Sequence, residues 1–85
     1  VFDGPIASRS LAAIHQARVL RQMGLHEEAQ DTYEWAGEDA ALIKDRELEG
    51  RALLGLAALS GQQGNYPRVI DYGMQALKKL PEDSE

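Results

Sequence analysis

The chain has 85 residues, of which 44% are hydrophobic and 27% charged, and its formal net charge at pH 7 is −5. A chain of this length holds one domain, since folding buries only about 60% of the surface that its unfolded form exposes, and the absence of cysteine excludes disulfides and thiolate metal sites. The acidic balance argues against general nucleic-acid binding, and the longest apolar run, residues 52–59, is far shorter than the ~20 residues of a membrane span, so no membrane protein is expected.

The first two predicted helices are separated by Gly24. Residues 5–10 contain a proline and two serines and are typical of a loop that leads into a helix, after which apolar side chains recur at helical spacing. Gly24 favours the left-handed conformation that ends helices, so a second helix is expected to begin near His26. The buried stripe predicted for this second helix is Ala29, Tyr33, Ala36, Ala40 and Ile43.

Asp45 can cap a third helix, which carries the broadest apolar face of the chain. That face consists of Leu48, Ala52, Leu53, Leu56, Ala57 and Leu59. Gly61 and Gly64 indicate the next turn, and Pro67 can occupy the first turn of a fourth helix. The inner face predicted for the fourth helix is Val69, Ile70, Gly73, Ala76, Leu77 and Leu80. Pro81 is expected to end this helix, residues 82–85 form an acidic tail, and no segment has a strand pattern.

The two halves of the chain align at a shift of forty residues. Superposing Gly24 on Gly64 gives six identities: Ala12/Ala52, Ala17/Ala57, Gln22/Gln62, Gly24/Gly64, Asp31/Asp71 and Ala36/Ala76. Several of them are small residues at spacings that close crossings between helices require. The sequence therefore predicts one domain, residues 1–85, built from two helix pairs at 8–43 and 45–81.

These two units resemble tetratricopeptide repeats, which are helix-turn-helix units with small residues at the crossing, a glycine at the turn and an aromatic side chain after it. The second unit has Gly64, Tyr66 and a closing Pro81, and the first has Gly24 and Tyr33 in phase. The resemblance covers residues 10–81 and implies an all-α fold of two pairs stacked as a right-handed α-solenoid. The period is longer than the usual ~34 residues, which is similar to the extended repeats of some scaffold proteins and bacterial transcription regulators.

Two motifs that could suggest chemistry are incomplete. Residues 26–30 begin like the H-E-x-x-H zinc helix, but Gln30 stands where the second histidine ligand would be. Residues 61–65 are rich in glycine but lack the lysine and hydroxyl residue of a phosphate-binding loop, so they indicate a turn. We therefore expect no enzyme activity, no cofactor and no metal.

In the tetratricopeptide family, the first helices of successive units line a concave groove that receives peptides. The positions of this chain that match are Leu11, Ile14, Arg18, Arg21, Gln22, Arg51, Leu54, Ala58 and Gln62. With three arginines among them, the resemblance implies a basic groove with apolar patches that binds an acidic peptide or helix of a partner protein. The alternative is that these arginines are solvated or pair with Glu47 and Glu49.

The expected function is thus a non-enzymatic protein-binding module of the cytoplasm, without nucleic-acid partners. Repeat arrays generally need three or more units to bury their continuous apolar face, so a fragment of a longer array, or a domain that self-associates as a homo-oligomer, is the alternative. A plain four-helix bundle with an accidental repeat is a third interpretation. Trp35 lies off the buried stripe and is expected to be covered within the fold, with an adjacent repeat or a partner as the alternative cover.

Overall fold

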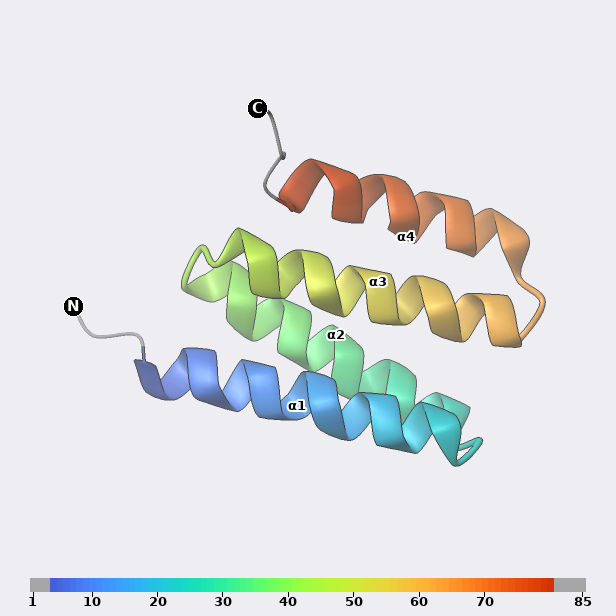
Figure 1. Ribbon diagram of the computed structural model, residues 1–85, viewed down its shortest axis with the longest axis horizontal. Helices are drawn as coiled ribbons and strands as arrows, with labels where there is room; N and C mark the ends of the chain where they lie inside the picture. The colour runs from blue at the N-terminus through green and yellow to red at the C-terminus, as the bar shows by residue number, and fades with distance from the viewer. Residues whose placement is uncertain (1–3, 81–85) are drawn as a thin grey trace.

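The computed structural model of the chain describes residues 4–80, which form four helices (Figure 1). The helices are α1 (Gly4–Gln22), α2 (His26–Leu42), α3 (Arg46–Gln62) and α4 (Tyr66–Lys79). Each helix runs antiparallel to the one before it, with α1 packed on α2 and α3 packed on α4. The all-α fold of two antiparallel helix pairs is therefore confirmed. None of these helices combines the length and apolar character needed to cross a bilayer.

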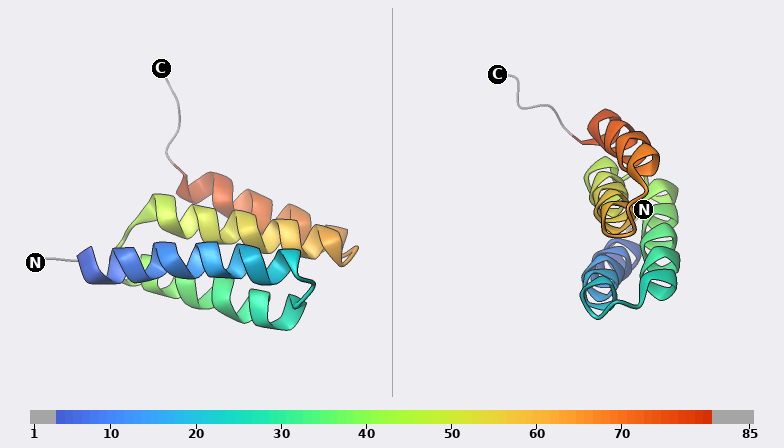
Figure 2. Two further views of the ribbon diagram at one scale, coloured as in Figure 1. Left: turned by 60° about the horizontal axis from the view of Figure 1, so that its bottom comes forward. Right: turned by 90° about the vertical axis from the view of Figure 1, so that its right-hand side faces the viewer.

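The two pairs are joined through α3. This helix packs on α2 as well as on α4, and it also approaches α1, so that α1 and α3 lie side by side with α2 behind them (Figure 2). The backbones of α2 and α4 make no close approach within the described residues. Helix α3 is consequently the most enclosed of the four, as its broad apolar face predicted.

Three turns of the same geometry connect the helices. Each contains one residue in the left-handed region, namely Gly24 (φ 83°), Lys44 (φ 57°) and Gly64 (φ 76°). In each turn the next N–H donates to the carbonyl oxygen five residues earlier: Leu25 to Leu20 at 3.0 Å, Asp45 to Ala40 at 2.9 Å, and Asn65 to Ser60 at 2.9 Å. These bonds satisfy the last carbonyls of each helix. The turns are twenty residues apart, so the forty-residue repeat contains a smaller unit of one helix and one turn.

The starts of α3 and α4 are capped by side chains. The Asp45 carboxylate accepts from the Leu48 N–H at 3.2 Å, which confirms the predicted cap, and the Asn65 side chain accepts from the Arg68 N–H at 3.4 Å. Pro67 lies in the first turn of α4, as predicted. At the other end of α4, Leu80 is extended, which is the conformation favoured before a proline. The predicted stop at Pro81 and the acidic tail lie outside the described residues.

Helix α1 begins at Gly4, so the predicted loop at residues 5–10 is wrong and the first helix pair begins before residue 8. Pro5 lies in the first turn, where the missing N–H has no helical partner to lose. Ser10 is fully buried, and its hydroxyl donates to the Ala36 carbonyl of α2 at 2.9 Å. Because its hydroxyl is bonded to α2, Ser10 packs at the helix crossing much as an alanine would. The loop was predicted because serine is common at helix caps.

Small side chains dominate the core. The buried hydrophobic residues among those described are Ala13, Ala17, Ala29, Tyr33, Ala36, Ala40, Leu48, Ala52, Leu56, Ala57, Leu59 and Ala76. Eight of these twelve are alanines, which lets the helices approach closely. Tyr33 is the one aromatic residue in this set, and its ring lies against α3 at Gly55, where a Cβ atom would overlap the ring. Leu80 packs on Gly50 in the same way, holding the end of α4 to α3.

The inner face of α4 differs from the prediction at two positions. Val69 and Leu80 are half-buried and Ala76 is buried, whereas Ile70 and Leu77 are exposed by 63% and 74%. Tyr72, absent from the predicted face, packs against the cluster of Ala17, Tyr33 and Leu56. The prediction failed because α4 is apolar over a wide arc, and helical spacing alone does not say which part of that arc meets α3.

Replacing Lys44 with glycine is expected to stabilise the domain. A side chain in the left-handed region costs about 1–2 kcal/mol, part of which is offset by the greater freedom of glycine in the unfolded chain. We expect Lys44→Gly to raise the free energy of unfolding by about 0.5–1 kcal/mol, measured by urea denaturation. Gly64→Ala, at the matching turn, should lower it, and an unstable Lys44→Gly variant would contradict this account.

Adding a methyl group at Gly55 is expected to destabilise the domain. The new Cβ would overlap the Tyr33 ring, so that α2 and α3 must separate or the ring must leave its site. We expect a loss of about 1–3 kcal/mol in the free energy of unfolding. Gly73→Ala is the matched control, since a Cβ there meets nothing within 4 Å, and its better helix propensity should add up to about 1 kcal/mol. Equal effects of the two substitutions would rule out this packing.

Candidate functional site

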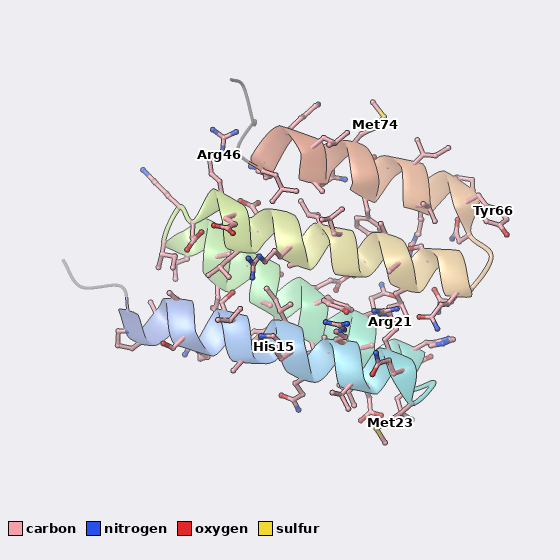
Figure 3. The ribbon with its side chains drawn as sticks, in the orientation of Figure 1. His15, Arg21, Met23, Arg46, Tyr66 and Met74 are labelled. Atoms are coloured by element: carbon pink, nitrogen blue, oxygen red, sulfur yellow. The ribbon has the colours of Figure 1, made fainter. Side chains whose placement is uncertain are left out.

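The candidate site is a groove of about 310 Å³ between α1 and α3, with α2 as its floor. The groove is lined by Leu11, Ile14, His15, Arg18, Arg21, Tyr33, Arg51, Leu54, Gly55 and Ala58. Seven of the nine residues predicted from the sequence are among them. Figure 3 shows His15 on this face of α1 and Arg21 beside α3.

The other two predicted residues do not line the groove. Gln62 lies close to it, because its side-chain oxygen accepts from the Arg21 Nη1 at 3.1 Å. Gln22 is exposed at the end of α1. Three residues that line the groove, His15, Tyr33 and Gly55, are absent from the predicted set. Helical spacing could have found His15, which neighbours Ile14 and lies one turn from Leu11, and Gly55, which neighbours Leu54 and lies one turn from Arg51. Tyr33 lines the groove only through the way α2 packs against α1 and α3.

The lining of the groove carries basic side chains and no acidic ones. Arg21 is held in place by two bonds, because its Nε also donates to the Tyr33 hydroxyl at 3.3 Å. Arg51 pairs with Glu47 at 2.9 Å, one turn earlier on α3. Both of these side chains are more than half exposed, so water and salt weaken their attraction and Arg51 can exchange Glu47 for another carboxylate. Arg18 is exposed on the same face.

Part of the alternative interpretation of the arginines is confirmed by these contacts. Arg51 pairs with Glu47 as that interpretation expected, but Glu49 lies 3.6 Å from the Lys79 ammonium of α4 instead. The Glu49–Lys79 pair therefore joins α3 to α4 and leaves the groove unaffected. The basic character of the groove is reduced at one of its three arginines only.

A second hollow of about 280 Å³ continues the groove toward the start of α1. Its lining shares Leu11 and Arg51 with the groove and adds Asp45 and Glu47. The combined surface is thus basic near Arg18 and acidic at its opposite end. A bound chain with charges of both signs would have a preferred direction on this surface.

The cleft between α2 and α3 on the other side of the domain has the opposite charge. This cleft of about 270 Å³ is lined by Tyr33, Glu34, Gly37, Glu38, Ala41, Glu49, Leu53 and Leu56. Tyr33 lines both the groove and the cleft, since its ring passes between α1 and α3. Glu34 and Glu38 of α2 and Glu49 of α3 therefore line this cleft and not the groove.

Arg9, Asp39 and Trp35 form a polar cluster where α1 crosses α2. The Arg9 Nε donates to the Asp39 carboxylate at 2.8 Å, and the Asp39 side chain is only 10% exposed. The Arg9 guanidinium also lies over the Trp35 ring, 5.3 Å from its centre. Trp35 remains 43% exposed, so its expected burial is wrong. A pattern of apolar residues could not reveal this cluster, because two of its three members are charged.

No protein-family description, curated protein sequence or solved structure matches this chain. Within residues 4–80, no three side chains of histidine, cysteine, aspartate or glutamate gather as metal ligands would. The case for a function therefore depends on the shape and charge of the surfaces described above.

Removing the Arg9 side chain is expected to destabilise the domain through Asp39. Arg9→Met leaves a largely buried carboxylate without its hydrogen-bond donor, which should lower the free energy of unfolding by about 1–3 kcal/mol. The double variant Arg9→Met with Asp39→Leu removes both charges and should recover much of the loss. Thermal denaturation of the three proteins tests this, and a single variant as stable as the original chain would contradict it.

Proposed function

We propose that this domain is a non-enzymatic module that binds an acidic segment of a partner protein in the groove between α1 and α3. The observation that carries the proposal is the lining of that groove, in which three arginines surround apolar side chains in a protein of net charge −5. A basic groove on an acidic protein selects against basic ligands while attracting carboxylates.

The partner contacts follow from the side chains in the groove. Guanidinium groups donate paired hydrogen bonds to carboxylates, so Arg18 and Arg51 are suited to glutamate or aspartate side chains. Leu11 and Leu54 keep 36% and 46% of their surface exposed and offer apolar contacts between those charges. Arg21 is fixed by the Tyr33 hydroxyl and by Gln62, and so loses little side-chain freedom on binding.

The acidic hollow beyond Arg51 sets the direction of the bound segment. Glu47 and Asp45 at that end repel carboxylates and favour a basic or neutral residue. The segment proposed here therefore has carboxylates near Arg18 and Arg21, apolar residues in its middle, and no acidic residue near Asp45. A short segment is sufficient, since the groove extends over only part of α1 and α3.

We extend the proposal to the architecture, in which each helix pair is a tetratricopeptide-like unit and the two units stack as a right-handed array. The identical turns at Gly24 and Gly64 and the forty-residue spacing support this assignment. So does the arrangement of the helices, because α1 and α3 lie on the groove side as the first helices of tetratricopeptide units do. The turn at Lys44 follows the same geometry, and the long period arises because α2 and α3 each span 17 residues before their turn.

Charge reversal in the groove tests the proposal. The probes are two labelled peptides of about twelve residues, one of alternating glutamate and leucine and the other of alternating lysine and leucine, and binding is measured by fluorescence anisotropy. We expect the glutamate peptide to bind more tightly, and Arg18→Glu with Arg51→Glu to weaken it at least ~10-fold, since each close charge pair contributes on the order of 1 kcal/mol. Binding should also fall as salt is added.

The control for this variant is Lys44→Glu with Arg68→Glu, which makes the same change in net charge at exposed positions outside the groove. If both double variants weaken binding equally, the effect is one of net charge and the groove is not the site. Equal affinity of the original chain for the two peptides would likewise overturn the proposal. Circular dichroism of each variant verifies that the helices are retained.

A further inference from the structure

The outer flank of α4 exposes a continuous stripe of large apolar side chains. The exposed fractions are 67% for Tyr66, 63% for Ile70, 58% for Met74 and 74% for Leu77. These residues follow each other at spacings of four, four and three, so they lie on one side of the helix. Figure 3 shows Met74 pointing away from α3 and Tyr66 projecting outward from the start of α4. A helix that ended the fold against water would be expected to have a polar outer face.

The internal repeat shows what this flank corresponds to elsewhere in the domain. A shift of forty residues places Ile70, Met74 and Leu77 on Gln30, Glu34 and Gly37 of α2. Glu34 and Gly37 line the cleft that α2 forms with α3, and a Cβ atom at Gly37 would touch the Ala52 side chain at 3.5 Å. The stripe thus lies on the flank of α4 that, on α2, borders α3: Gly37 lies against that helix, while Glu34 at the rim of the cleft stays exposed.

Gly73 lies between the stripe and the inner face of α4. A Cβ atom built at Gly73 meets nothing within 4 Å, in contrast to Gly50 and Gly55, each of which receives a side chain from a neighbouring helix. The α4 backbone is therefore open to close approach by another helix at the middle of the stripe.

The charges beside the stripe indicate how a second helix would be oriented. Asp71 and Lys78 lie two turns apart on the same edge of the stripe, and Asp71 is bonded only to Gln75 of its own helix, at 3.2 Å, among the described contacts. When two copies of one helix pack antiparallel about a two-fold axis, the same edge of each copy meets, in opposite directions. Asp71 of each copy then lies near Lys78 of the other, whereas a parallel two-fold pair brings opposite edges together and leaves these charges unpaired across the interface.

We propose that the stripe of Tyr66, Ile70, Met74 and Leu77 is a self-association surface, on which α4 of a second copy of this chain packs antiparallel. The four side chains expose roughly 500 Å² per copy, so the pair buries on the order of 1,000 Å², near the lower limit for a specific interface. A weak dimer in rapid exchange with the monomer is expected at that size. The groove lies between α1 and α3 and remains open in this dimer.

Sedimentation equilibrium over a dilution series tests the proposal, from about 500 μM to about 1 μM in protein, the range in which an interface of this size dissociates. The mass of the original chain should fall from nearly twice the monomer mass to the monomer mass. Leu77→Lys should raise the dissociation constant at least ~10-fold, because it places a charge within the buried stripe.

Leu42→Lys is the matched control. Leu42 is 70% exposed, close to the value for Leu77, and both leucines lie in the last turn of their helices, where lysine is well tolerated. Leu42→Lys should leave the dissociation constant within about twofold of the original, a difference below ~0.4 kcal/mol. Equal weakening by the two leucine variants, or a monomer throughout the dilution series, would overturn the proposal and leave the stripe to a helix of another protein.

A charge exchange tests the antiparallel two-fold arrangement. Lys78→Glu should weaken the dimer, and the double variant Asp71→Lys with Lys78→Glu should restore it, because the pairs across the axis are re-formed with opposite signs. Failure of the double variant to restore dimerisation, or a mass rising beyond that of two chains, would exclude the two-fold pair. Arg18→Glu with Arg51→Glu should leave the dimer unchanged, so this result is independent of peptide binding in the groove.

Discussion

The contact between the Tyr33 ring and the α3 backbone at Gly55 is the interaction on which the rest of the structure depends. The ring is 2% exposed and packs against Ala17 of α1 and Leu56 of α3, so a single side chain joins three helices. Because Gly55 has no side chain, α3 can approach α2 closely enough for the alanines on either side to meet. The same ring forms part of the groove floor, and its hydroxyl holds Arg21. Packing and the candidate site are therefore coupled through one residue.

The separation of charge across the domain follows from the order in which the helices cross. Helices α1 and α3 meet on one face and bring Arg18, Arg21 and Arg51 to a common groove, while α2 lies behind them with most of the acidic side chains of residues 4–80. Glu47, on α3, lies beside the groove arginines and pairs with Arg51. An acidic protein thus acquires a basic surface, to which α1 contributes Arg18 and Arg21 and α3 contributes Arg51.

Helix α4 lacks a neighbour on one of its two flanks in the described part of the chain. Each unit presents one flank to the helix before it and one to the helix after it, and α2 and α3 use both. Helix α4 has the apolar residues for two neighbours but only one neighbour, α3, in the described part of the chain. Ile70 and Leu77, which were predicted to lie inside, are exposed on this second flank. Their exposure is the reason for expecting a further helix there.

The sequence by itself determined the four helices, the turns at Gly24 and Gly64, the cap at Asp45 and the alanine-rich crossings, because these depend on local backbone preference and on helical spacing. It also placed seven of the ten groove residues, through the repeat and the resemblance it supports. Only the tertiary structure decided which arc of α4 faces α3, that Ser10 is a crossing residue bonded to α2, and that Tyr33 reaches the groove. These features depend on how helices distant in sequence cross. Helical spacing leaves several faces of a helix equally suited to packing, and a glycine without a Cβ atom or one hydrogen bond between helices decides which face is buried.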